Sequence, residues 1–216
     1  MTQASARRSA NVTWQLSGAT REQRWSARGH DGATLWFTGL PASGKSTVAA
    51  ALEARLTELG ASAYLLDGDN LRHGLNGDLG FDEAARRENI RRTAHVARLL
   101  ADAGVVALAS LVSPFAADRD RARQMHEDEE ILFLEVHVAT PLEVCERRDP
   151  KGLYAKARRG ELVEFTGVSA PYEPPRRPDL RVAETDSVLD AAERCLAALR
   201  DRGWRLRSPA VAARRS

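Results

Sequence analysis

Gly39-Leu40-Pro41-Ala42-Ser43-Gly44-Lys45-Ser46 is the most informative stretch of this chain, because it fits the phosphate-loop pattern G-x-x-x-x-G-K-[ST]. Residues 34–38 before it form a short apolar run typical of a buried strand, and residues 48–59 after it carry leucine and valine at helical spacing. Glycines let the backbone N–H groups turn inward around an anion, and the start of the helix adds partial positive charge. The order strand, glycine loop, helix therefore predicts nucleotide binding rather than an incidental glycine turn.

The loop residues have separate roles in this prediction. Lys45 is expected to reach the β- and γ-phosphates of ATP, and Ser46 is expected to hold Mg²⁺. ATP and Mg²⁺ are the cofactors that the pattern implies. The predicted nucleotide-binding residues are Gly39, Leu40, Pro41, Ala42, Ser43, Gly44, Lys45, Ser46 and Thr47.

Composition favours one globular α/β domain. The chain has 216 residues, of which 43% are hydrophobic and 29% are charged, enough for one good core. No apolar run approaches the ~18 residues of a membrane span, and residues 1–10 contain no apolar segment of a signal peptide. We therefore expect a soluble, cytoplasmic protein that does not bind membranes.

Cys145 and Cys195 fall in helical patterns without C-x-x-C spacing, so they are expected to be buried and unpaired.

Charge is nearly balanced, with 32 Lys and Arg against 30 Asp and Glu, which argues against a general nucleic-acid binder. The arginines near the two ends of the chain are expected to lie in solvated, frayed segments. They are Arg7, Arg8, Arg205, Arg207, Arg214 and Arg215.

Strand-like and helix-like patterns alternate along the chain. Further apolar runs occur at residues 63–66, 105–112, 131–138 and 180–182, with helical patterns at 83–103, 115–127, 141–148 and 187–200. Such alternation predicts right-handed crossovers and a parallel sheet that is covered by helices on both faces.

Two stretches, residues 20–32 and 151–178, break the alternation, and the second is long for a connection, which is typical of a functional lid. The predicted fold class is thus α/β, a P-loop NTPase-type parallel sheet with helices on both faces and a mobile lid. The predicted organisation is an N-terminal extension (1–32), a kinase domain (33–204, lid about 151–178) and a basic C-terminal tail (205–216).

Candidate chemistry follows the strands, because ligands of an open α/β sheet bind at the carboxyl ends of its strands. Asp67-Gly68-Asp69 follows the second apolar run and offers two carboxylates, one to orient an attacking hydroxyl and one to order water on Mg²⁺. The alternative is an Asp-Gly turn before a capped helix. Ser113-Pro114 follows the third run, where an N-cap is the default interpretation and a catalytic role stays open.

Side chains near the start of the long helix pattern add to this site. Asp82 is expected to cap that helix, whereas Phe81 has no obvious apolar partner and is free to stack on a base. Arg86, Asn89 and Thr93 share one helix face, which is either solvated or substrate-binding.

Together these motifs resemble the adenylylsulfate kinase (APS kinase) family over about residues 14–204. The resemblance rests on several collinear motifs: Thr20-Arg21-Glu22, Gly29-His30-Asp31-Gly32-Ala33, the phosphate loop, Asp67-Gly68-Asp69-Asn70-Leu71-Arg72-His73-Gly74-Leu75-Asn76, Asp78-Leu79-Gly80-Phe81, Arg87-Glu88-Asn89-Ile90-Arg91-Arg92, Asp118-Arg119-Asp120, Arg148-Asp149-Pro150-Lys151-Gly152-Leu153-Tyr154 and Phe165-Thr166-Gly167. It implies transfer of a phosphoryl group from MgATP to the 3′-hydroxyl of adenosine 5′-phosphosulfate (APS), which makes the sulfate donor PAPS.

The resemblance also implies a role for each site residue. Asp69 and Lys45 would be catalytic, with Asp69 beside the 3′-hydroxyl, and Ser46 and Asp67 would serve Mg²⁺. Ser113 matches a serine described as a phosphoryl-enzyme intermediate in some members. The residues expected to contact APS are Asp69, Arg72, Phe81, Arg86, Asn89, Val112, Ser113, Lys151 and Phe165, with the two phenylalanines enclosing the adenine.

Asp69 and Asp67 together are sufficient for direct transfer, since one carboxylate accepts the hydroxyl proton while the other orders water on Mg²⁺. No base adjoins Ser113 in the sequence, so we expect it to act by position. Pro41-Ala42 and Leu111-Val112-Ser113-Pro114-Phe115 depart from the usual family pattern without removing a reactive group.

Two other functions stay open: a different small-molecule P-loop kinase, and a non-catalytic nucleotide-gated regulator or partner of ATP sulfurylase. The resemblance further implies a homodimer, with the segment near Arg21 at its interface, and an association with ATP sulfurylase.

Overall fold

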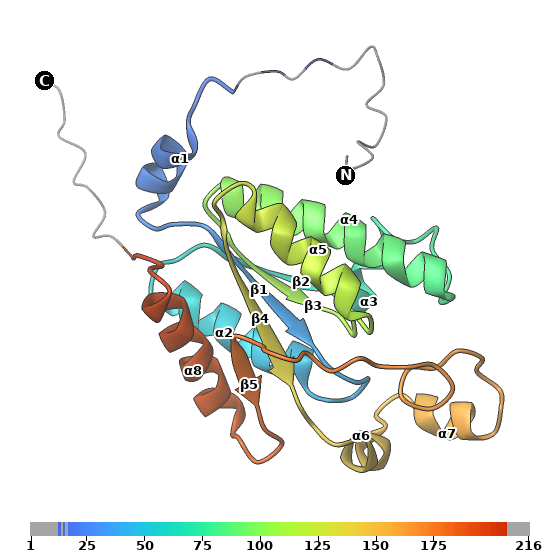
Figure 1. Cartoon of the computed structure of the whole chain (residues 1–216). Helices are drawn as coiled ribbons and strands as arrows, with labels where there is room; N and C mark the ends of the chain where they lie inside the picture. Colours follow the sequence, from blue (N-terminus) through green and yellow to red (C-terminus); the bar gives the residue numbers. More distant parts are fainter. Residues whose placement is uncertain (1–12, 14, 16, 207–216) are drawn as a thin grey trace, which may run out of the picture.

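A five-stranded parallel sheet forms the centre of the protein (Figure 1). The computed structural model describes residues 13, 15 and 17–206, and its strands lie in the order β2-β3-β1-β4-β5. Their bounds are β1 Ala33–Thr38, β2 Ala63–Asp67, β3 Val106–Ser110, β4 Leu132–Val138 and β5 Leu180–Val182. The central strand is β1, so the glycine loop that follows it lies at the middle of the carboxyl edge of the sheet. The predicted parallel sheet is confirmed.

Helices cover both faces of this sheet (Figure 1). The longer ones are α2 Lys45–Glu58, α4 Glu83–Asp102, α5 Ala116–Glu127 and α8 Val188–Asp201. α2 packs with α8 on one face, and α4 packs with α5 on the other. Leu35 and Phe37 of β1 belong to the core under α2 and α8, whereas Trp36 belongs to the core under α4 and α5, as the two-residue period of a strand requires.

The remaining helices are short: α1 Arg21–Arg28, α3 Gly68–Leu71, α6 Leu142–Arg148 and α7 Leu153–Arg158. Of these, the sequence patterns predict α6, and α3 is the capped helix given as the alternative for the Asp-Gly-Asp sequence. α1 begins with a capping box in which Thr20 Oγ1 accepts from Gln23 N and Gln23 Oε1 accepts from Thr20 N. This T-x-x-Q pattern is a signal that locates the helix from sequence. α7 lies inside the predicted lid segment, which is therefore partly helical.

The last described residues pair with the segment just before β1. His30 forms an isolated antiparallel bridge with Leu206, and Asp31 N donates to the carbonyl oxygen of Arg205. The expectation of a frayed segment at Arg205 is therefore wrong, because its backbone is paired although its side chain is exposed. Residue 14, where the family resemblance begins, is outside the described residues, as are the other arginines predicted to lie in frayed ends: Arg7, Arg8, Arg207, Arg214 and Arg215.

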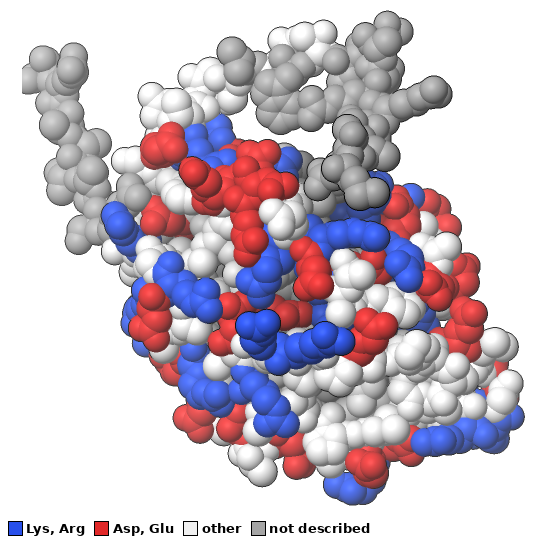
Figure 2. Space-filling model, in the orientation of Figure 1, with Lys and Arg blue, Asp and Glu red and all other residues white. Residues whose placement is uncertain are grey.

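Cys145 and Cys195 are both buried and unpaired, as predicted. Within residues 13, 15 and 17–206, no helix has the length and apolar character needed to cross a membrane. Basic and acidic side chains are interspersed on the face drawn in Figure 2, where they form no continuous basic surface.

Candidate active site

The phosphate loop connects β1 to α2 in a conformation that its glycines make possible. A Cβ atom on Gly39 would lie 2.5 Å from the carbonyl oxygen of Val138, and Gly44 has φ +101°, in the left-handed region. Ala42 also has a left-handed φ, +59°, which costs a residue with a Cβ about 1 kcal/mol. The loop therefore keeps one strained non-glycine position beside its two permissive glycines.

Lys45 is the first residue of α2 and is almost completely buried within this loop. Its Nζ donates to the carbonyl oxygen of Leu40 at 2.8 Å and to Ser43 Oγ at 3.4 Å. Burial lowers the pKa of Lys45 to about 8, while the nearby Asp67 and Asp69 oppose that shift. The ammonium is thus held where phosphates would bind. Its burial disfavours the charged form, and the negative charge of a bound phosphate would offset that cost.

A hydrogen bond between Ser46 and Asp67 joins the start of α2 to the end of β2. Ser46 Oγ donates to Asp67 Oδ2 at 2.6 Å and lies 3.1 Å from Ser110 Oγ at the end of β3. The other oxygen of Asp67 accepts from the backbone amides of Asp69 and Asn70, so Asp67 also caps α3. Both interpretations of the Asp-Gly-Asp sequence therefore hold at Asp67, the capped helix and the site carboxylate.

The hydroxyl and carboxylate oxygens of Ser46 and Asp67 are the hard donors that Mg²⁺ prefers. Within the described part of the chain, no cluster of three His, Cys, Asp or Glu side chains could hold a metal ion. The pair fits a magnesium ion whose remaining ligands are phosphate oxygens and water, as is usual at phosphoryl-transfer sites.

Asp69, two residues farther along, forms an ion pair with Lys151, which lies at the start of the lid segment. Both side chains are more than half exposed. Asp67 is the N-cap of α3 and Asp69 is the second residue of that helix, so the two carboxylates start from neighbouring points of the backbone. The structure thus brings together the predicted general base and a predicted substrate-binding lysine from 82 residues away.

Phe81 and Arg72 contact each other in the segment between α3 and α4. Phe81 is 63% exposed, and the Arg72 guanidinium lies 4.1 Å from the centre of its ring. Arg72 Nη1 also donates to the carbonyl oxygens of Leu79 and Gly80. Asp82 caps α4 as predicted, since its side chain accepts from Ala85 N at 2.9 Å. An exposed ring with a cation on one face is a surface on which a nucleotide base can stack.

Arg86 links α4 to the lid. Its Nε donates to the carbonyl oxygen of Phe81 at 2.6 Å, Nη1 to Thr166 Oγ1 at 2.7 Å and Nη2 to the carbonyl oxygen of Glu164 at 2.5 Å. Phe165 lies between the last two contacts and packs edge-on against Tyr154, with ring centres 5.0 Å apart. One guanidinium therefore holds the backbone next to both phenylalanines that are predicted to enclose the adenine.

Asn89 lies one turn farther along α4 and is buried. Its Oδ1 accepts from Asn76 Nδ2 at 2.8 Å, and its backbone oxygen accepts from Thr93 Oγ1 at 2.7 Å. The group that Asn89 can offer to a ligand is its amide NH₂, a donor suited to ribose or phosphate oxygens.

Ser113 does not cap α5, and the default interpretation of this serine is wrong. The N-cap of α5 is Phe115, and the first free amide of the helix, Ala116 N, donates to Glu173 Oε2 at 2.8 Å. Ser113 Oγ instead accepts from Trp36 Nε1 at 3.1 Å. A carboxylate from a distant segment has taken the capping position, so the serine hydroxyl is engaged elsewhere.

Sequence reasoning did not assign a role to three residues that touch this site. Arg148 Nη1 lies 3.4 Å from the carbonyl oxygen of Ser43 in the phosphate loop, and Tyr154 Oη donates to that of Pro41 at 3.0 Å. Arg119 Nη1 donates to the carbonyl oxygen of Ser113 at 2.6 Å. All three lie in the motifs of the resemblance, but only the folded chain shows what they contact.

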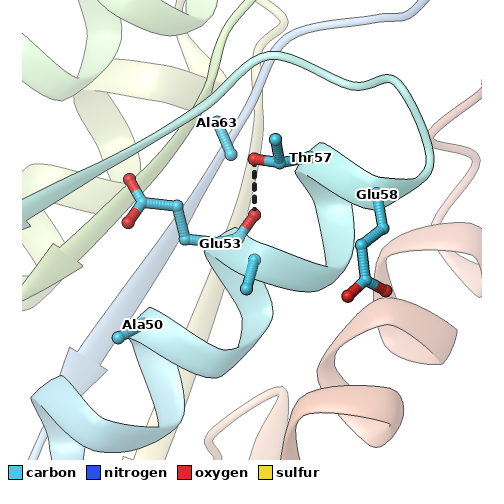
Figure 3. Close-up of a pocket in the computed structure, with 6 residues that line it drawn as sticks. Ala50, Glu53, Thr57, Glu58 and Ala63 are labelled. Atoms are coloured by element: carbon cyan, nitrogen blue, oxygen red, sulfur yellow. Dashed lines mark hydrogen bonds between the residues drawn. The ribbon is translucent and has the colours of Figure 1, made fainter.

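A hollow of about 480 Å³ lies elsewhere, along the second half of α2. Figure 3 shows its lining, in which Thr57 Oγ1 donates to the carbonyl oxygen of Glu53. Glu53 Oε1 accepts from Leu65 N at 2.7 Å on β2, an edge strand of the sheet. Glu53 thus satisfies an amide of the edge strand, and the predicted catalytic residue Lys45 lies at the other end of α2. The residues that line the hollow are Ala50, Glu53, Ala54, Thr57, Glu58 and Ala63.

Comparison with known proteins shows the family to which this chain belongs. The family model described as adenylylsulphate kinase matches residues 31–183, which include the phosphate loop, Asp67, Asp69 and the whole lid segment. The chain belongs to the adenylylsulphate kinase family. Among its relatives, the adenylyl-sulfate kinase of Clostridium acetobutylicum is 50% identical over 190 residues, 88% of this chain and 92% of the relative.

Two further comparisons agree with this family. The adenylyl-sulfate kinase of Saccharomyces cerevisiae is 53% identical over 180 residues, 83% of this chain and 89% of the relative. The solved structure of the Mycobacterium tuberculosis APS kinase CysC in complex with AMPPNP and APS matches with a TM-score of 0.77 and 55% identity, over 79% of this chain and 98% of that one. The adenylylsulphate kinase fold thus extends over most of the described residues.

Proposed function

We propose that this chain transfers the γ-phosphoryl group of MgATP to the 3′-hydroxyl of APS, giving PAPS and ADP in sulfate activation. The observation that carries the proposal is the 2.6 Å hydrogen bond between Ser46 and Asp67, which joins the phosphate loop to the Asp-Gly-Asp loop. Support comes from the related structure that holds both AMPPNP and APS at 55% identity. ATP would then bind at the phosphate loop and APS beside it, near Asp69, at the same edge of the sheet.

On the donor side, the loop amides and Lys45 hold the phosphates of ATP. The ammonium of Lys45 is buried, so its charge acts on the transferring phosphoryl group with little screening by water. Ser46 and Asp67 would hold Mg²⁺, which when bound neutralises charge on the β- and γ-phosphate oxygens. Arg148, beside Ser43, adds a second cation at the outside of the loop.

On the acceptor side, Asp69 is the general base for the 3′-hydroxyl. Its present partner Lys151 is a predicted ligand of the phosphosulfate, so binding of APS would draw the lysine to the substrate and leave the carboxylate to accept the proton. Arg72, Arg86 and Asn89 would hold the phosphosulfate and ribose, with Val112 beside the substrate. Phe81 and Phe165 would enclose the adenine, which selects a purine-bearing acceptor over a sugar.

The test is a coupled assay of ADP formation with MgATP and APS, run beside sugar and nucleoside acceptors. APS-dependent ADP formation that exceeds formation with every other acceptor supports the proposal. Faster turnover of a sugar or nucleoside would establish the different P-loop kinase. Binding of ATP without turnover of any acceptor would establish the non-catalytic regulator.

Direct transfer and a phosphoserine route are separated by a rapid quench with γ-labelled ATP, with and without APS. In direct transfer the label moves to PAPS and never to the protein. Labelled Ser113 that forms and decays at the rate of turnover would overturn direct transfer.

The setting of the enzyme belongs to the same proposal. We expect a cytoplasmic homodimer that associates with ATP sulfurylase and binds neither nucleic acid nor membranes. Light scattering on the purified protein measures its mass, and co-purification with a tagged ATP sulfurylase tests the association. A monomeric mass would contradict the dimer.

A further inference from the structure

Ser113 has an unusual backbone conformation that several hydrogen bonds hold in place. Its φ is +40°, a region that residues with a Cβ seldom occupy, and the residue is only 2% exposed. Trp36 donates to its hydroxyl oxygen, and Arg119 donates to its carbonyl oxygen. Thr38 Oγ1 donates at 2.8 Å to the carbonyl oxygen of the preceding Val112. Strain of this kind persists where the surroundings over-determine the backbone, as at functional sites.

The bond from Trp36 sets the direction of the serine hydroxyl. An indole N–H donates and cannot accept, so Ser113 Oγ is the acceptor at 3.1 Å and its hydrogen must point elsewhere. The acceptor that the structure offers to this hydrogen is the carbonyl oxygen of Leu111 at 3.5 Å, the outer limit for a hydrogen bond. The hydroxyl is therefore free to donate to a closer oxygen.

Trp36 itself cannot turn away. It is fully buried in the central strand, where its neighbours on β3 and β4 are Ala109 and Glu135. Its ring stacks on Phe133, with the ring centres 6.1 Å apart and the planes 28° apart. The position of the N–H is thus set by the sheet, whose edge also carries the phosphate loop.

We propose that Trp36 is a positioning residue, whose indole N–H holds Ser113 as a hydrogen-bond donor to an oxygen of the acceptor nucleotide. The inference rests on the proposed function. It also agrees with the expectation that Ser113 is not a nucleophile, because a nucleophilic serine needs a base to take its proton and the acceptor in place is a backbone carbonyl.

A double-mutant cycle tests this assignment. Trp36→Phe keeps an aromatic ring and removes the N–H, and we expect it to lower kcat/KM for APS by about 3- to 10-fold while the KM for ATP stays unchanged. Ser113→Ala is expected to cause a similar loss, and adding Trp36→Phe to it is expected to cause no further loss. Losses that multiply in the double variant would overturn the proposal.

Phe133→Leu is the matched control for packing, because it disturbs the stack on Trp36 without removing the N–H. It should lower the melting temperature and leave kcat/KM for APS near that of the wild type. A loss in kcat/KM equal to that of Trp36→Phe would assign the effect to packing and overturn the proposal.

A measurement on the intact fold covers the case in which Trp36→Phe does not fold. In protein labelled with ¹⁵N-tryptophan, Ser113→Ala should move one indole N–H resonance upfield, because that proton loses its acceptor. Unmoved indole resonances would overturn the proposal. A wild-type protein without APS-dependent turnover would instead defeat the proposed function, and the resonance would still report the hydrogen bond.

Discussion

The phosphate loop and the lid differ in where the partners of their side chains lie in the sequence. Within the loop, Lys45 bonds to Leu40 and Ser43, its near neighbours in the sequence, and is buried. The lid is held from far away, since Thr166 accepts from Arg86 across 80 residues and Lys151 pairs with Asp69 across 82. We therefore expect the phosphate loop to keep its shape when substrate binds, and the lid to exchange its contacts for contacts with substrate. We expect variants of the loop to stop the reaction and variants of the lid to weaken binding of the acceptor.

Lys45→Ala should give the largest effect, loss of measurable turnover, because loop amides, this ammonium and Mg²⁺ stabilise the charge of the transition state. The measurement is kcat in the coupled assay, with circular dichroism to confirm folding. Lys45→Met is the matched variant that keeps the buried stem, and it should be equally inactive. A folded variant with the turnover of the wild type would contradict the role of the loop.

Asp69→Asn should lower kcat by about 10²- to 10⁴-fold, the usual loss for a general base. Asp69 lies in α3, and its partner Lys151 begins the lid. Glu58→Gln, which removes an exposed carboxylate paired with Arg55, is the control and should keep the kcat of the wild type. Retained kcat in Asp69→Asn would mean that another group takes the proton.

Phe81→Ala should raise the KM for APS by roughly 5- to 150-fold, since one stacking face is worth ~1–3 kcal/mol. The KM for ATP should change far less. Tyr64→Ala is a close control, because Tyr64 is 58% exposed against 63% for Phe81 and lies on the edge strand β2. Equal losses for both nucleotides would show that Phe81 supports the fold rather than the adenine.

Thr166→Val should raise the KM for APS by roughly 3- to 10-fold, with kcat nearly unchanged, because it removes one hydrogen bond between the lid and Arg86. Valine has the shape of threonine, so packing at this buried position is kept. Thr57→Val removes an exposed hydroxyl bond on α2 and serves as the control. A fall in kcat alone would assign the lid to catalysis instead of binding.

The smallest expected effect is proton uptake by Lys45 of the phosphate loop when nucleotide binds. The pKa of Lys45 is lowered from 10.5 to about 8 by burial, and bound phosphates should raise it again. Nucleotide binding at pH 8 should therefore take up as much as about half a proton. Calorimetry in buffers of different ionisation enthalpy measures this uptake, and Lys45→Met should abolish it. Equal uptake in that variant would assign the proton to another group.

The sequence predicts the loop well because its geometry is local. The glycines, Lys45 and Ser46 lie within eight residues, and their conformation follows from the turn that the pattern requires. The parallel sheet is predictable for a related reason, since each buried strand shows as an apolar run.

The interpretation of Ser113 as a cap is wrong because the competing groups, Trp36 and Glu173, lie 77 residues before it and 60 residues after it in the chain. The contacts of Arg86 with the lid are not predictable for the same reason, since their partners lie about 80 residues away. The catalytic roles of Asp69, Ser113 and the substrate-binding residues stay predictions, which the experiments above test.

Glu173 has a consequence for the order in which the protein folds. Its side chain completes the first turn of α5, its amide donates to the carbonyl oxygen of Pro114, and its own carbonyl oxygen accepts from Arg119. These three bonds join segments more than fifty residues apart, so they form after a large loop has closed. A nascent chain can build α2 early, because the backbone bonds of a helix are local, whereas β1 must wait for its partners β3 and β4. The bonds that secure the Ser113 loop to the lid must wait until residue 173 has been made.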